Sequence, residues 1–144
     1  MRSNARSLAA AVMLGLAGCA TPAPRPAESC DAAFDHADAL LREGLATYVG
    51  EIRRYAHARD PELSTASAEE RAWSRADAWT ASRRPGFVAA CRSWPGDQVR
   101  CVLVADVPRV LSACGLEALV KSFTDDVVAE FAARPVEPAA APAR

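Results

Sequence analysis

Five cysteines are the side chains of this 144-residue sequence best suited to chemistry, and they stand at positions 19, 30, 91, 101 and 114. Thiolates hold zinc or attach haem when they are clustered, as in Cys-x-x-Cys or Cys-x-x-Cys-His, and neither spacing occurs here. Cys30, Cys91, Cys101 and Cys114 form an even set, which two disulfides could join in an oxidising compartment. The sequence therefore predicts no metal site and no cofactor, and it favours cross-linking of the chain.

Acid–base chemistry has few candidates. The two histidines, His36 and His57, are 21 residues apart on the polar side of a predicted helix, so we expect both to be solvated. The adjacent acids Glu69-Glu70 and Asp125-Asp126 point about 100° apart on a helix, so each pair is better explained by a helix cap or a solvated face. No glycine-rich phosphate loop, His-Glu-x-x-His motif or nucleophile elbow is present. We therefore expect a protein that is not an enzyme.

Aromatic and cationic side chains could form a recognition surface, because tryptophan and arginine dominate binding hot spots. The candidates are Trp73, Trp79 and Trp94 together with Arg53, Arg54, Arg83 and Arg84. The apolar spacing assigns Trp73 and Trp94 to the core, whereas Trp79 fits that spacing less well. The sequence therefore predicts a candidate binding surface made of Trp79, Arg83 and Arg84.

The first 18 residues have the layout of a signal peptide. Arg2 and Arg6 precede an apolar run from Leu8 to Leu16, which is too short for a membrane-spanning helix of about 20 residues. The run ends at Leu16-Ala17-Gly18-Cys19, which resembles the lipobox of bacterial lipoproteins. The resemblance implies that the thiol of Cys19 receives a diacylglyceryl group and that Cys19 becomes the first residue after cleavage.

The same resemblance implies a location. The lipid on Cys19 would anchor the chain to a membrane of the cell envelope, facing the periplasm, and two or more acyl chains hold a protein firmly to a bilayer. Ala20 stands where aspartate would oppose sorting to the outer membrane, so the outer membrane is favoured. Ordinary signal-peptide cleavage, which would leave Cys19 as a free thiol, is the alternative.

Export would place the other four cysteines in an oxidising compartment, where two disulfides are the default expectation. Four cysteines allow three connectivities, which the sequence alone does not distinguish. We favour Cys30–Cys91, which would tie the first helix to the rest of the chain, and Cys101–Cys114, which would close a short helical hairpin near Asp106. Buried thiols acting as small apolar side chains are the alternative.

Proline-rich segments flank a single predicted domain. Residues 1–18 are the signal peptide, and residues 19–28, with three prolines, form an extended spacer after the lipid-bearing cysteine. Residues 29–134 are long enough to form one helical domain with its own core. Residues 135–144, with three further prolines among alanines, are predicted to be a disordered tail.

Apolar spacings of three and four predict an all-α fold, a small disulfide-linked helical bundle of two long helices plus three shorter ones. The long helices span about 30–57 and 116–133. The apolar stripe of the first consists of Phe34, Ala37, Leu41, Leu45, Tyr48, Ile52 and Tyr55. Shorter helices are expected at 67–82, 87–94 and 97–105, followed by a brief helical segment that Asp106 begins.

Local signals set the helix boundaries. Ser29 is predicted to cap the first helix, and Ser67-Ala68-Glu69-Glu70 has the form of a capping box. Arg83-Arg84-Pro85-Gly86 is predicted to be a turn, and Gly115 to end a helix. The apolar run 101–105 could form a strand, but helix is favoured because a lone strand would have no partner.

Charge and motifs together limit the functional classes. The 17 basic and 18 acidic side chains form no concentrated basic stretch, so no nucleic-acid partner is expected. The segment from Phe87 to Cys114 resembles a pattern in small uncharacterised cysteine-containing helical envelope proteins, which implies exported, disulfide-bonded helices. We expect a membrane-anchored envelope lipoprotein that serves as a binding or accessory protein for an envelope protein partner. A small periplasmic enzyme or enzyme inhibitor is the alternative.

Overall fold

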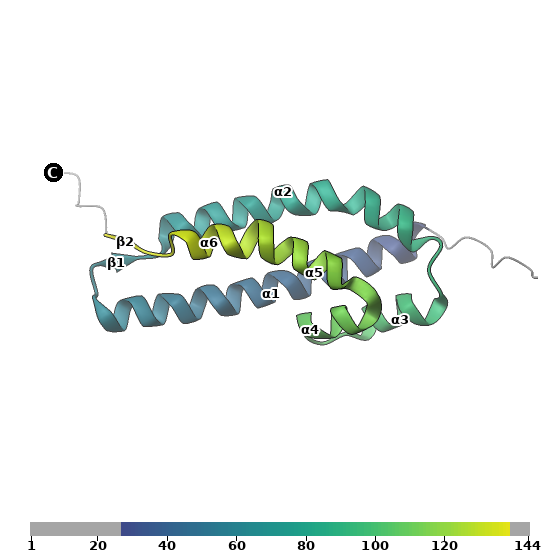
Figure 1. Cartoon of the computed structure of the whole chain (residues 1–144), viewed down its shortest axis with the longest axis horizontal. Coiled ribbons are helices and arrows are strands. Elements are labelled where there is room, and N and C mark those ends of the chain that lie inside the picture. Colours follow the sequence, from purple (N-terminus) through teal and green to yellow (C-terminus); the bar gives the residue numbers. More distant parts are fainter. Residues whose placement is uncertain (1–26, 139–144) are drawn as a thin grey trace, which may run out of the picture.

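Two long antiparallel helices set the length of the molecule, which the structure, a computed structural model, describes over residues 27–138 (Figure 1). Helix α1 runs through the 33 residues Ala27–Arg59, and α2 returns beside it over Ala66–Cys91. At about 1.5 Å per residue, α1 extends about 50 Å from one end of the bundle to the other. The predicted all-α, disulfide-linked bundle is confirmed.

The rest of the chain packs along these two helices. After α3, Gly96–Val104, come α4, Pro108–Leu111, and the kinked segment η1, Ser112–Leu116. The last helical layer consists of α5, Glu117–Phe123, a π-helical turn η2, Thr124–Val128, and α6, Ala129–Ala133. Strand β1, Leu63–Ser64, pairs antiparallel with β2, Glu137–Pro138, so that Leu63 lies opposite Pro138 and Ser64 opposite Glu137.

The core forms where the three helical layers meet. Its largest fully buried side chains include three phenylalanines and two leucines: Phe34, Phe123, Phe131, Leu45 and Leu111. The predicted stripe of α1 is confirmed up to Ile52, which packs against this core. Tyr55 is an exception, because its side chain is 65% exposed. Helix α1 extends beyond the end of α6, so the C-terminal helices that cover the stripe elsewhere do not reach its last turns (Figure 1).

Both predicted disulfides are present. Cys30 at the start of α1 is bonded to Cys91 at the end of α2, with Cα atoms 5.8 Å apart. Cys101 in α3 is bonded to Cys114 in η1, with Cα atoms 5.6 Å apart. The run 101–104 is helical, as favoured, and Gly115 kinks the chain inside η1 with a φ of 85°, a value that suits glycine. The bridges fasten the end of the bundle at which α1 begins.

The turn predicted at residues 83–86 is wrong, because α2 continues through it to Cys91. Pro85 removes one helical hydrogen bond and crowds the preceding turn, which normally ends or kinks a helix. Here the residues beyond it are held by packing: the Phe87 ring lies 5.1 Å from that of Phe34, and Cys91 is bonded to α1. Tertiary contacts therefore outweigh the local signal, and α1 and α2 are the two longest helices.

The first two helices begin one to three residues earlier than predicted. Helix α1 begins at Ala27, so Ser29 lies inside its first turn. Helix α2 begins at Ala66, and the hydroxyl of Thr65 donates a hydrogen bond to the Glu69 carboxylate instead of the predicted capping box. The backbone N–H of Ala66 donates to Ser64 Oγ at 3.2 Å, which satisfies one of the unpaired amides that every helix start leaves.

The predicted boundary of the disordered tail, residue 135, is too early in the chain. Residues 135–138 belong to the fold, because β2 pairs with β1 and an Arg71 guanidinium nitrogen lies 3.4 Å from a Glu137 carboxylate oxygen. The same guanidinium group donates to the backbone carbonyl of Arg134. The rest of the predicted tail, 139–144, lies outside the described residues.

Arg42 fixes the register of α1 against α2. Its guanidinium group donates to Asp38 on its own helix at 2.8 Å, and to Asp77 and Thr80 on α2 at 2.9 and 2.8 Å. The hydroxyl of Thr80 donates back to Asp38 at 2.7 Å. Each bond in this cluster has a charged partner, and sliding one helix along the other would break the three bonds that cross from α1 to Asp77 and Thr80 of α2.

Candidate functional site

The residues of the predicted anchor, including the lipobox and Cys19, lie outside the described part of the chain. Within residues 27–138, no helix is long and apolar enough to cross a membrane. The same residues contain no group of three histidine, cysteine or acidic side chains placed to hold a metal ion. The disulfides are structural links between helices, so a candidate site must be sought among the other side chains.

Trp79 does not belong to a surface, contrary to the prediction. Its side chain is only 3% exposed and stacks near Phe34 at a centroid distance of 6.4 Å, with Phe123 edge-on at 5.0 Å. The indole N–H donates to Ser122 Oγ at 3.1 Å, which satisfies the one polar atom of the ring. Because α2 continues past Ser82, Trp79 lies at its centre instead of at its end, where the C-terminal layer covers it.

Arg83 and Arg84 are held by acids of the neighbouring helices. A guanidinium nitrogen of Arg83 lies 3.2 Å from an Asp126 carboxylate oxygen. Arg84 pairs with Asp31 at 3.1 Å and with Asp35, and its guanidinium carbon lies 4.8 Å from the centre of the Phe34 ring. With Trp79 buried, the predicted binding surface of these three residues is wrong, while Arg83 and Arg84 stay partly exposed and pair with acids of neighbouring helices.

The two histidines have different surroundings. His36, predicted to be solvated, is half-buried, and its Nε2 lies 2.8 Å from the carbonyl oxygen of Ala105. This contact joins α1 to the end of α3. His57 is exposed, as predicted, and it stands at the opposite end of the molecule, where α1 gives way to α2.

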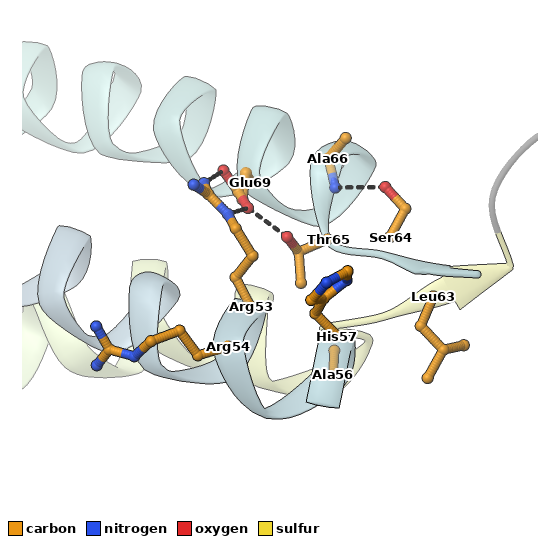
Figure 2. Close-up of a pocket in the computed structure, with 9 residues that line it drawn as sticks. All are labelled: Arg53, Arg54, Ala56, His57, Leu63, Ser64, Thr65, Ala66 and Glu69. Atoms are coloured by element: carbon orange, nitrogen blue, oxygen red, sulfur yellow. Dashed lines mark hydrogen bonds and ion pairs between the residues drawn. The ribbon is translucent and has the colours of Figure 1, made fainter. Parts of the chain in front are cut away.

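That end of the bundle, here called the tip, consists of the last two turns of α1, the connection 60–65, the first turn of α2, and β2. A hollow of about 550 Å³ lies there between the two helices, within the range of ligand-binding clefts. We call it the polar hollow, and its lining is Arg53, Arg54, Ala56, His57, Leu63, Ser64, Thr65, Ala66 and Glu69. Figure 2 shows Arg53 reaching across from α1 to Glu69 of α2, while Arg54 extends along α1.

Glu69 is the one carboxylate in the polar hollow, and its position is fixed by two neighbours. Arg53 Nε donates to a Glu69 carboxylate oxygen at 2.9 Å, a second guanidinium nitrogen contacts the other oxygen, and Thr65 adds a hydroxyl donor. Burial raises the pKa of Glu69, but these hydrogen bonds and the charge of Arg53 outweigh it, so the pKa lies below its usual value. Glu69 is therefore an ionised structural acid.

Two cationic or ionisable groups of the polar hollow remain available. The side chains of Arg54 and His57 make none of the hydrogen bonds or ion pairs found within residues 27–138. Ser64 Oγ is engaged with the Ala66 amide, and no hydrogen bond joins it to His57 in the described chain. The polar hollow can therefore receive a polar group beside His57, while Arg54 extends away along α1 (Figure 2), and the described residues show no base aligned on a nucleophile.

Sequence reasoning missed the polar hollow because its wall comes from three separate segments. In the sequence Arg53 and Arg54 belong only to a wider cationic set, and nothing in the pattern predicts that Glu69 neutralises one of them. The usable signal was the short connection, residues 60–65, between the helix end at Arg59 and the helix start at Ala66. Such a tight connection brings the carboxyl end of one helix to the amino end of the next.

Comparison of the chain with protein-family models, with curated proteins and with solved structures finds no match. A function for this chain therefore has to follow from its own residues and their placement.

Proposed function

We propose that this protein is an envelope lipoprotein, anchored through acylated Cys19, that displays the tip as a binding site for another envelope component. One observation carries the proposal. The chain enters the fold at Ala27, whereas the polar hollow lies at the other end of α1, about 50 Å away along the helix (Figure 1). A membrane anchor before Ala27 would leave the tip as the part of the domain that reaches farthest from the bilayer.

Rigidity supports the same role. The Cys30–Cys91 bridge and the Arg84 pairs brace the end at which the chain enters, and the Arg42 cluster ties α1 to α2 midway. A braced rod can present a site at a set distance from its attachment without ordering cost on binding. We propose an accessory or assembly role without catalysis, facing the periplasm, with the outer membrane as the favoured location.

Anchoring is tested by Cys19→Ser. Without the thiol no lipid can be attached, so we expect the chain to move from the membrane fraction to the soluble fraction, with at least a roughly tenfold change in their ratio. Thr21→Ala, two residues away, should stay with the membrane. Mass spectrometry of the non-reduced wild-type protein should find an acylated Cys19 as its first residue. An unmodified Cys19 thiol, or a chain that still begins at Met1, would contradict the proposal.

Binding at the tip is tested by placing the photo-reactive residue p-benzoylphenylalanine at His57. Illumination of cells should join this position to one envelope component, seen as a discrete adduct in the membrane fraction. Ala46, which is exposed at the middle of α1, provides the matched control position. Adducts that are equally abundant at Ala46 and His57, or absent from both, would show that the tip has no dedicated partner.

A further inference from the structure

A second hollow at the tip has almost entirely apolar walls. It has a volume of about 360 Å³ and is lined by Ile52, Tyr55, Ala56, Arg59, Leu63, Pro135 and Val136. We call it the apolar hollow. It shares Ala56 and Leu63 with the polar hollow. At 100° per residue, α1 turns two sets of side chains to nearly opposite sides: Arg53, Arg54 and His57 toward the polar hollow, and Ile52, Tyr55 and Arg59 toward the apolar one.

Tyr55 makes the apolar hollow unusual. Among the described residues, the exposed large hydrophobic side chains are Tyr55 at 65%, Leu103 at 41% and Val104 at 71%, and neither of the last two lines a hollow of the tip. Covering an aromatic knob and the apolar hole beside it with a matching surface lowers the free energy, because apolar area is removed from water. Tyrosine is also enriched at the centres of protein interfaces.

Two charges of opposite sign flank this knob and hole. Arg59 lines the apolar hollow, and Glu62 immediately precedes Leu63 in its wall. Although only two residues lie between them, neither side chain belongs to an ion pair within residues 27–138, whereas Arg53 and Arg71 nearby are each paired with an acid. The patch thus carries a knob and a hole, and a cation and an anion, in adjacent positions.

We infer that the apolar hollow is the contact surface for a second copy of this chain. A two-fold axis places the same patch on both sides of an interface, so residue i of one copy meets residue j of the other and the reverse. Here Tyr55 of each copy covers the hollow of the other, and Arg59 of each copy faces Glu62 of the other. A surface that complements itself in both shape and charge is what such an interface requires.

The contact is expected to be weak between free molecules. One helix end and a two-residue strand form a patch smaller than the roughly 1,200–2,000 Å² that stable interfaces bury. Confinement of the copies to one membrane raises their effective concentration and makes such a contact productive. The inference does not require the polar hollow to bind anything, since that hollow lies on the other side of α1.

The test uses the full chain in living cells, with p-benzoylphenylalanine at Tyr55. The substitution keeps an aromatic ring at an exposed position, so the fold is preserved. Illumination should give an adduct of twice the chain's mass that contains only this protein by mass spectrometry. The same residue at Val104, which is also exposed, serves as the control and should give at most about a tenth of that yield.

Charge inversion decides whether the geometry is the one inferred. Arg59→Glu and Glu62→Arg, each introduced together with the photo-reactive residue, should each lower the self-adduct yield about tenfold, because like charges then face each other. Co-expression of the two charge-inverted forms with different tags should restore a mixed adduct. A self-adduct that neither inversion affects would overturn the inference. So would a yield no higher than at Val104, or an adduct with a different protein in place of the second copy.

Failure here is distinguishable from failure of the proposed function. Self-adducts form through position 55, whereas capture of another envelope component is read at position 57 on the other side of the helix. Loss of the first signal with the second intact leaves the tip as a binding site for a different partner. Loss of the second with the first intact leaves a lipoprotein that associates only with itself.

Discussion

Replacing both Cys30 and Cys91 by alanine is expected to lower the free energy of unfolding by about 4 kcal/mol. The bridge closes a loop of 61 residues, and the entropy that a cross-link removes from the unfolded chain grows with the logarithm of loop length. Both cysteines are fully buried, so alanine is the proper replacement, since a serine hydroxyl there would add the cost of an unsatisfied polar group. Urea unfolding followed by circular dichroism measures the loss.

The second bridge supplies an internal comparison. Cys101 and Cys114 are only 13 residues apart, so the corresponding double alanine variant should lose about 3 kcal/mol, roughly 1 kcal/mol less than the first. The two bridges also hold different parts of the fold. The first bridge joins the two longest helices, whereas the second holds α3 to η1 beside them. Equal losses, or a larger loss for the shorter loop, would mean that native-state strain or residual structure in the unfolded chain outweighs loop entropy.

The observed disulfide pairing is one of the three that the sequence left open, and it was favoured because Cys30–Cys91 would tie the first helix to the rest of the chain. In the structure Cys30 lies near the start of α1 and Cys91 at the end of the returning α2. The short spacing from Cys101 to Cys114 matches a hairpin that turns at Asp106. The stripe of α1 was equally legible, since every third or fourth residue from Phe34 to Ile52 is apolar. In each case the signal lies within a single helix or a single hairpin.

The failed predictions share one physical cause, which is that contacts distant in sequence overrode local preference. Pro85-Gly86 is a strong turn signal, yet packing of Phe87 on Phe34 carries the helix through it. Val136 and Glu137 lie in a proline- and alanine-rich segment, yet pairing with β1 and the Arg71 ion pair order them. No window of the sequence contains either contact, so no pattern within a window could reveal them.

The candidate site was less predictable than the fold for the same reason. Arg53 and Glu69 are 16 residues apart and belong to different helices, so their pairing depends on how tightly the chain turns between residues 60 and 65. The exposure of Tyr55 depends on where α6 ends, which is set by Arg134 and the strand that follows. A periodic stripe predicts the direction of a side chain, but it does not predict whether a neighbour is present to cover it.

Trp79→Ala is expected to lower the free energy of unfolding by about 3–5 kcal/mol, the range for removing a buried tryptophan. The ring stacks near Phe34 and packs edge-on against Phe123, so its loss opens a cavity between α1, α2 and α5. Trp79→Phe keeps one aromatic ring in the core, but it loses part of the indole volume and the hydrogen bond to Ser122, whose hydroxyl can still reach Asp126 at 3.3 Å. That variant should lose less than Trp79→Ala, about 1–3 kcal/mol.

Tyr55→Ala is the matched control for this experiment, because it also removes a large aromatic ring, from the exposed end of the other long helix. We expect it to change the free energy of unfolding by less than about 0.5 kcal/mol, as exposed substitutions do. The contrast separates the two roles of aromatic residues in this chain, since burial makes Trp79 part of the fold while exposure leaves Tyr55 free to act between molecules. A Trp79→Ala loss no larger than that of Tyr55→Ala would mean that the indole is exposed to solvent. It would also contradict the continuous course of α2 through Pro85.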